Sequence, residues 1–176
     1  MKNNNTTNHI RHATHDNVPP IADESCTVLL LGSMLSPKSA LESFYYAHPQ
    51  NRFWRVISAV LGCDCPINNA EKARLVLSHN IALWDVISSC DIMGASDSTI
   101  TNVVYNDISG LLARYRTITR IFTTGRKAHE LLMRYNQNIN NHIIGQAVRL
   151  PSTSPQNCKI KLDELTKAYS VINNPT

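Results

Sequence analysis

The stretch Cys26-Thr27-Val28-Leu29-Leu30-Leu31-Gly32-Ser33 indicates the class of fold, because a short apolar run ends abruptly in a glycine. An uninterrupted apolar run of this length is typical of a strand that is buried on both faces. The Gly32-Ser33 pair marks the point at which the chain turns into a loop. The sequence therefore predicts a buried strand over Cys26–Leu31 that opens into a loop.

Two helical patterns follow this strand. The apolar positions of the first, spaced i, i+3, i+4, i+7 and i+8, are Phe53, Val56, Ile57, Val60 and Leu61. This spacing places one apolar face on a helix that ends at Gly62. A second helix is expected to begin at Asn68 or Asn69, with Glu71 completing a capping box on Asn68.

The remaining predicted elements continue the alternation. They are a strand or extended segment over Ile81–Ile87, a loop over Asp91–Thr101, a helix over 108–115 capped near Asn106 or Asp107, a strand over Ile118–Thr123, a helix with Ala128 and Tyr135 on its apolar face, a weaker strand over Ile143–Leu150 and a last helix over 162–172. Alternation of this kind predicts an α/β fold, a three-layer sandwich with a central, mostly parallel four-stranded sheet and helices on both faces.

Ligands of such folds bind beyond the carboxyl ends of the strands. The loops that begin at Gly32, Gly125 and Pro151 each follow a predicted strand. We therefore expect these three loops to converge on one crevice.

The composition predicts one globular domain. The 176 residues are enough for one buried core, which we expect over 23–176, and the polar residues 1–22 are expected to be a disordered tail. No apolar run approaches a membrane span and no signal-like segment is present, so we expect a cytoplasmic protein. The five cysteines, an odd number, are expected to be reduced thiols. The net charge of +4 permits a polyanionic partner without requiring one.

An aromatic segment carries the strongest functional signal: Phe44-Tyr45-Tyr46-Ala47-His48-Pro49-Gln50-Asn51-Arg52-Phe53-Trp54. Aromatic rings can stack on a planar ligand, and an amide can hydrogen-bond to the edge of that ligand. A base flipped out of a nucleic acid is recognised by this combination. The alternatives are structural: Asn51 could cap the following helix, Phe53 and Trp54 could belong to the core, and His48 could hold the turn.

Three further segments accompany it. They are Leu150-Pro151-Ser152-Thr153-Ser154-Pro155-Gln156-Asn157, Thr123-Thr124-Gly125-Arg126-Lys127-Ala128 and Ala82-Leu83-Trp84-Asp85-Val86-Ile87. The first offers hydroxyls and backbone amides to phosphates, or else leads into the last helix with Asn157 as its cap. The second places cations at a helix start. Asp85 could position a water molecule or make a structural hydrogen bond.

Together these segments resemble the hypoxanthine (deoxyinosine) DNA glycosylase family of the uracil-DNA glycosylase superfamily, over roughly Val28 to Tyr169. The aromatic segment is also similar to that of the mismatch-specific uracil-DNA glycosylases. The loop after Gly32 departs from both patterns. Met34 stands where the superfamily often has Asn or Asp, and a thioether cannot activate water. Leu35 replaces a proline of the family.

The resemblance implies the roles of the site residues. Asn51 would be the catalytic residue, and Tyr46 would stack on the base. Base contacts would come from Tyr46, Gly32, Ser33, Met34, His48 and Ser152. Contacts to DNA would come from Lys38, Arg52, Arg126, Lys127, Thr153, Ser154, Pro155 and Asn157.

The resemblance also implies the activity. The chain would be a monofunctional N-glycosylase that hydrolytically excises a deaminated base, most readily hypoxanthine, from damaged DNA in base excision repair. It would act as a monomer without metal or cofactor, and no lysine is placed to form a Schiff base. The alternatives are a mismatch-specific uracil-DNA glycosylase, a DNA-binding homologue that is weakly active or inactive, and an enzyme that hydrolyses free nucleosides.

Overall fold

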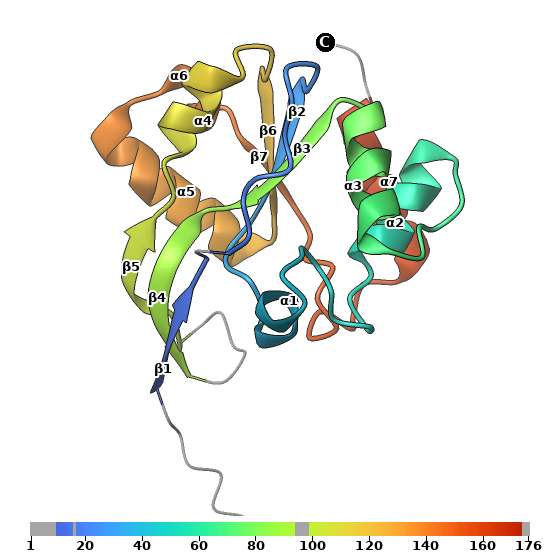
Figure 1. The fold of residues 1–176 in the computed structure, drawn as a ribbon, viewed down its shortest axis with the longest axis horizontal. Coiled ribbons are helices and arrows are strands. Elements are labelled where there is room, and N and C mark those ends of the chain that lie inside the picture. The colour runs from blue at the N-terminus through green and yellow to red at the C-terminus, as the bar shows by residue number, and fades with distance from the viewer. Residues whose placement is uncertain (1–9, 16, 94–98, 174–176) are drawn as a thin grey trace, which may run out of the picture.

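The computed structural model of the chain describes residues 10–15, 17–93 and 99–173. A four-stranded parallel sheet forms its centre, with the strand order β3-β2-β6-β7 (Figure 1). The strands are β2 (Val28–Gly32), β3 (Ile81–Asp85), β6 (Arg120–Thr124) and β7 (Val148–Leu150). The predicted α/β fold with a central parallel sheet of four strands is therefore confirmed.

Strand β2 lies in the middle of this sheet, and all five of its residues are buried. It needs apolar side chains on both faces because helices cover both, which explains the uninterrupted apolar run in the sequence. Its parallel register with β3 sets Gly32 beside Asp85, and its register with β6 sets Leu31 beside Thr123. The strands consequently end at one edge, where polar residues of separate segments meet.

Helices cover both faces of the sheet (Figure 1). The buried side chains between the helices and the sheet form one apolar cluster on each face. The helices of one face are α2 (Phe53–Leu61), α3 (Asn69–Ser78) and α7 (Leu162–Tyr169). Those of the other face are α4 (Ile108–Arg114), α5 (Arg126–Ile139) and α6 (His142–Gly145). A short helix α1 (Pro37–Leu41) follows β2, and a 3-10 helix η2 (Ser170–Asn173) follows α7. No helix within the described ranges is both long and apolar enough to cross a membrane.

The predicted helix boundaries hold where a cap is present. Gly62 ends α2 in the left-handed conformation with φ of 69°, which a glycine adopts without strain. Asn68 accepts a hydrogen bond from the backbone of Glu71, and Asp107 accepts one from Gly110, as the capping pattern predicts. The predicted strand over Ile143–Leu150 is wrong in its first half, because Asn141 caps α6 by accepting from two backbone N–H groups. Strand β7 occupies only the second half.

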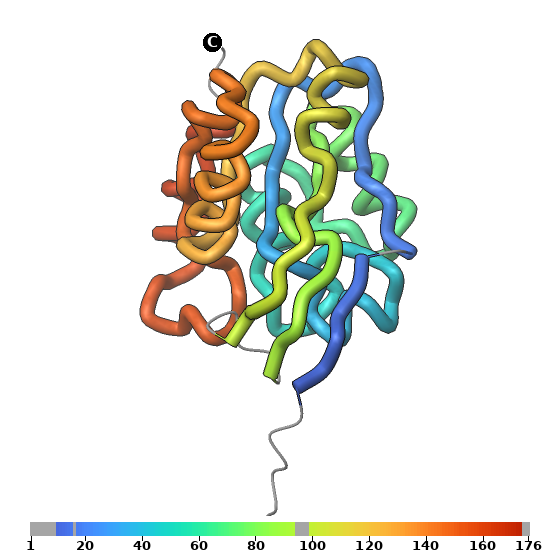
Figure 2. The backbone as a smooth tube through the Cα atoms, turned by 90° about the vertical axis from the view of Figure 1, so that its left-hand side faces the viewer, coloured from blue at the N-terminus to red at the C-terminus, as the bar shows by residue number. Residues whose placement is uncertain are grey.

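A second sheet was not predicted. It is antiparallel with the order β1-β4-β5 and consists of β1 (Ile10–Thr14), β4 (Ile87–Met93) and β5 (Thr101–Tyr105). Figure 2 shows the three strands side by side at the edge of the molecule. Only Val86 separates β3 from β4, so one stretch of chain runs from the first sheet into the second.

Two expectations are corrected by this sheet. The segment Ile10–Thr14 lies within the stretch expected to be disordered, yet it pairs with β4 along its whole length, and Ile21 forms an isolated bridge to Leu83. The expected loop over Asp91–Thr101 begins inside β4 and ends inside β5. Its middle, residues 94–98, lies outside the described part of the chain. Residues 1–9 of the expected tail also lie outside it.

Candidate active site

A cavity of about 350 Å³ lies at the carboxyl edge of the parallel sheet. This volume is within the range of small-molecule sites, about 300–1,000 Å³. Its walls come from the loop after β2, the aromatic segment before α2 and the loop after β7, together with Asp85 at the end of β3 and Thr124 at the end of β6. The predicted convergence is confirmed for the loops after Gly32 and Pro151, whereas Thr124 rather than Gly125 contributes from β6.

The orientation of the Asn51 amide is determined by two donors. Its Oδ1 accepts a hydrogen bond of 2.9 Å from the backbone N–H of Phe53 and another of 2.9 Å from the hydroxyl of Thr153. A backbone N–H can only donate, so the atom facing Phe53 must be the oxygen. Both lone pairs of Oδ1 are then occupied, and Nδ2 is the polar group left to meet a ligand in the cavity. Asn51 therefore both stabilises the start of α2 and lines the site.

Tyr46 presents an aromatic ring to the same cavity. Its backbone is left-handed, with φ of 52°, which is uncommon for a bulky residue. Two contacts stabilise this conformation: the ring stacks on Phe53 with a centroid distance of 3.7 Å, and the hydroxyl bonds to Thr124 at 2.9 Å. Burial, and then the charge of Asp85, raise the pKa of Tyr46 well above its ordinary value. The ring is thus neutral, and its face opposite Phe53 is the one that a ligand could contact.

Asp85 lies against Gly32 at the inner end of the cavity. A Cβ atom at Gly32 would be only 2.1 Å from Asp85 Oδ1, so any other residue at this position would displace the carboxylate. The other oxygen, Oδ2, is 2.9 Å from Nε2 of His15, and both side chains are buried. This geometry gives the physical reason for the glycine that ends β2. It also makes Asp85 a site residue with a structural partner.

His15 is a site residue that the sequence analysis missed. Its backbone N–H donates to the carbonyl of Ser88 in β4, at 2.8 Å, and its ring lies 5.8 Å from that of Tyr45. The ordered N-terminal segment thereby carries the imidazole to Asp85, across 70 positions of sequence. No local signal could have revealed it, because His15 is one of several histidines in a polar stretch.

Arg52 holds the loop after β7 in place through hydrogen bonds to the loop backbone. Its guanidinium donates to the carbonyls of Ser154 at 3.2 Å, Asn157 at 2.8 Å and Ile160, and its backbone N–H donates to Thr153 at 3.1 Å. Asn157 closes the same loop by donating from Nδ2 to the carbonyl of Ser152 at 2.8 Å. The hydroxyl of Tyr169 in α7 donates to the carbonyl of Pro151 at 2.8 Å.

Three residues predicted to contact DNA make hydrogen bonds within the protein instead. Arg52 faces loop carbonyls rather than solvent, because its planar group of donors matches three backbone acceptors. Thr153 is buried and bonds to Asn51, so it supports the site from inside. The Asn157 amide is engaged within the loop, and it caps no helix: α7 begins at Leu162, where Glu164 accepts from the N–H of Lys161.

The other predicted site residues divide into two groups. Gly32, Ser33, Met34, Ser152 and Ser154 line the cavity, and Met34 contributes only an apolar surface that packs against the core. His48 is not among the lining residues, because its ring accepts from the N–H of Gln50 and holds the turn.

The predicted phosphate contacts outside the cavity are surface residues. Lys38 pairs with Glu42, and Arg126 pairs with Glu130 at 3.2 Å. Lys127 and Pro155 are half-buried.

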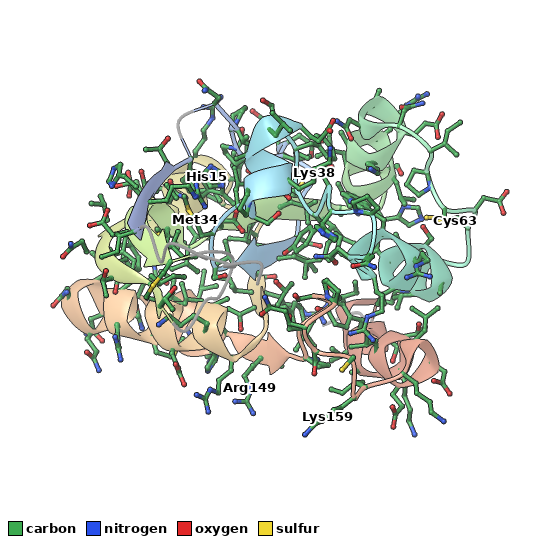
Figure 3. All side chains as sticks on the ribbon, turned by 90° about the horizontal axis from the view of Figure 1, so that it is seen from below. His15, Met34, Lys38, Cys63, Arg149 and Lys159 are labelled. Atoms are coloured by element: carbon green, nitrogen blue, oxygen red, sulfur yellow. The ribbon has the colours of Figure 1, made fainter. Side chains whose placement is uncertain are left out.

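Two exposed cations lie at the loop after β7. Arg149 lies in β7 just before the loop, and Lys159 lies near the end of the loop, before α7 begins. Figure 3 views the molecule from below, the side to which the carboxyl ends of the parallel strands point, and shows both side chains projecting outward. Sequence reasoning did not single them out, because an isolated cation has no pattern until the fold places it beside a site.

Comparison with known proteins gives named relatives. The chain is 37% identical over 113 residues to a hypoxanthine DNA glycosylase of Methanosarcina acetivorans, an alignment that covers 64% of this chain and 72% of the relative. It is 31% identical over 113 residues to a hypoxanthine DNA glycosylase of Methanosarcina barkeri, with the same coverage. No family model matches the chain.

The fold also has a solved counterpart. A solution NMR structure of a Methanosarcina acetivorans protein, described as a candidate uracil DNA glycosylase, matches with a TM-score of 0.73 and 27% sequence identity. The match covers 89% of this chain and 97% of that structure. The sheet and its flanking helices therefore belong to one shared architecture.

Proposed function

The chain belongs to the hypoxanthine DNA glycosylase family, and we propose that it is a monofunctional DNA glycosylase that removes hypoxanthine from DNA. The observation that carries this proposal is the pairing of the Asn51 amide with the Tyr46 ring in one cavity. A base buried in a duplex cannot reach such a cavity, so the nucleotide must first be flipped out of the stack. The cavity then offers one aromatic face, several hydroxyls and one amide to the base.

The proposed reaction is hydrolysis of the N-glycosidic bond. The bond between C1′ of the sugar and N9 of hypoxanthine breaks, and its electron pair passes to the base. Water adds to C1′ and loses a proton, and the base takes up a proton, so the products are free hypoxanthine and an abasic site. If the bond is largely broken before water attacks, the reaction needs positioning and electrostatic stabilisation more than a strong base.

Asn51 would act as a hydrogen-bond donor in this reaction. Its Oδ1 is occupied by Phe53 and Thr153, so Nδ2 is the atom available to an acceptor on the departing purine. A donor aimed at that acceptor stabilises the negative charge that develops on the base. Tyr46, kept neutral by its raised pKa, would stack on the base without adding a second negative charge.

Uracil is the second candidate base. The solved structure described as a candidate uracil DNA glycosylase and the likeness of the aromatic segment to mismatch-specific enzymes favour it. Met34 weighs against it, because the cavity has an apolar group where those enzymes carry a polar one. A binding module without activity remains the third reading, and it would leave the lesion intact.

We also propose the domain organisation, oligomeric state and compartment of the enzyme. The chain would form a single domain that acts as a monomer in the cytoplasm on damaged DNA. The five cysteines are free thiols in the structure, which suits a reducing compartment. Arg149, Lys159 and the half-buried Lys127 would contact phosphates beside the lesion.

Base release from duplex oligonucleotides with one inosine or one uracil tests the proposal, under single-turnover conditions with excess enzyme. The expected result is release from the inosine duplex and an abasic site that breaks only when heated in alkali. Release from the uracil duplex alone would show that uracil, the second candidate base, is the substrate. Binding of both duplexes without release from either would contradict the enzymatic reading.

A further inference from the structure

The His15–Asp85 pair at the inner end of the cavity has no role in the reaction as described above. We propose that the Asp85 carboxylate accepts a hydrogen bond from the ring N–H that deamination creates on a base, and that His15 positions the carboxylate for this contact. Deamination changes a ring nitrogen from an acceptor in adenine to a donor in hypoxanthine. It makes the same change from cytosine to uracil. A group that can only accept therefore distinguishes the damaged base from its precursor.

The first support is the depth of Asp85. Only 3% of its surface is exposed, and it is the last residue of β3, at the edge of the sheet. A flipped nucleotide enters base first, while its sugar stays attached to the DNA at the mouth. The far edge of the base, which carries the ring N–H, would reach Asp85. Water attacking C1′ would have to act nearer the mouth, which separates this role from that of a water-positioning acid.

The second support is that the two oxygens of the Asp85 carboxylate have different neighbours. Oδ2 faces His15 Nε2 at 2.9 Å, whereas Oδ1 lies beside Gly32, where the absence of a side chain leaves it room. Among the described residues that line the cavity, Asp85 is the one carboxylate. The nearby Tyr46 hydroxyl is bonded to Thr124, so Oδ1 is the acceptor in position to meet a ring N–H.

The third support is the fixed position of His15. A buried carboxylate is costly unless it is hydrogen-bonded, and His15 supplies a donor that is itself buried. Its backbone N–H donates to the carbonyl of Ser88 and its ring lies beside that of Tyr45, and these contacts place the imidazole at the carboxylate. His15 is thus a positioning residue that acts through Asp85. Guanine and thymine also carry a ring N–H, so their exclusion must rest on other parts of the cavity.

This inference rests on the proposed function, and substrate pairs can separate the two. The substrates are duplexes with one deoxyinosine, which has the ring N–H, or one deoxynebularine, whose ring nitrogen at this position is an acceptor. Single-turnover rates would be compared for the wild type, Asp85→Asn, His15→Gln and His15→Leu. Thermal unfolding would confirm that each variant is folded. The intrinsic reactivity of the substrates cancels when the ratio of the inosine rate to the nebularine rate in a variant is compared with the same ratio in the wild type.

The expected result is a selective loss. Asp85→Asn can turn its amide NH₂ toward the base, so its inosine rate should fall about 10- to 100-fold, the value of one hydrogen bond to a charged group. Its nebularine rate should not fall. His15→Leu should lower the ratio of the inosine rate to the nebularine rate. His15→Gln, which keeps a hydrogen-bond donor, should retain most of the wild-type ratio.

Two results would overturn the inference while leaving the glycosylase intact. An equal loss on both substrates in Asp85→Asn would assign the carboxylate to the attacking water. An unchanged ratio in both Asp85→Asn and His15→Leu would show that neither residue reads the base. If the wild type released no base from either duplex, the proposed function would fail and this inference with it.

Discussion

In Asn51 the two polar atoms of one side-chain amide differ in their surroundings: Oδ1 is hydrogen-bonded within the protein, and Nδ2 is left to meet a ligand. The sequence left open whether it caps the helix or serves the site. In the structure the N-cap of α2 is Arg52, while the Asn51 oxygen accepts from the N–H of Phe53 and from Thr153, which leaves the nitrogen for a ligand. Neighbouring residues in the sequence revealed Asn51 and Tyr46, because their types and order are unusual. The partners of Asn51 and Asp85, namely Thr153 and His15, could not be inferred from sequence, because they lie 102 and 70 positions away from them.

Thr153→Val should slow base release without unfolding the protein. The change keeps the shape of the side chain but removes the hydroxyl that orients Asn51, and it should lower the release rate about 10-fold, the value of one hydrogen bond of typical strength. The free energy of unfolding should fall by about 0.5–1.5 kcal/mol. Single-turnover release and urea unfolding measure the two effects. Thr153→Ser is the control and should retain both the release rate and the stability of the wild type. A Thr153→Val enzyme as fast as the wild type would contradict the orienting role.

At the scale of elements, the loop after β7 is a rigid part of the site because α2 and α7 both hold it. Arg52 precedes α2 and Tyr169 lies at the end of α7, and each donates to loop carbonyls. The periodic helices were predictable from their apolar faces and caps. The second sheet was not, since β1 has one buried residue of five and β5 has none, so neither shows the alternation that marks a strand.

Arg52→Lys should loosen this loop. Lysine keeps the charge but cannot match three carbonyls with one planar group, so acceptors lose their partners. We expect the free energy of unfolding to fall on the order of 2–3 kcal/mol and limited proteolysis between residues 151 and 160 to accelerate. Arg55→Lys, on the exposed side of α2, is the matched control. Equal proteolysis of the two variants would show that Arg52 does not hold the loop.

At the scale of the whole molecule, the placement of charge matters more than its total. The net charge of +4 is modest, but Arg149 and Lys159 both project beside the loop that borders the cavity (Figure 3). Arg114 and Arg116, also exposed, lie near the start of β6, at the opposite end of the parallel sheet. Arg149 and Lys159 therefore lie beside the site, whereas Arg114 and Arg116 lie away from it.

The double variant Arg149→Gln/Lys159→Gln should weaken binding to duplexes of any sequence. If each residue neutralises one phosphate, the slope of log Kd against log salt concentration should become shallower by about 2. Fluorescence anisotropy over a range of NaCl concentrations measures it. Arg114→Gln/Arg116→Gln removes the same charge and should leave the slope unchanged. Equal changes in both double variants would attribute the effect to net charge alone.

The most direct test of the account compares hypoxanthine release from an inosine duplex by the wild type, Asn51→Asp and Asn51→Ala under single-turnover conditions. Asn51→Asp can still accept from Phe53 and Thr153, so the local fold should persist while the Nδ2 donor is lost. The account predicts free hypoxanthine from the wild type and rates lower by about 100-fold or more in both variants, as for removal of one catalytic donor. An Asn51→Asp enzyme as fast as the wild type, or a wild type that releases no base, would contradict it.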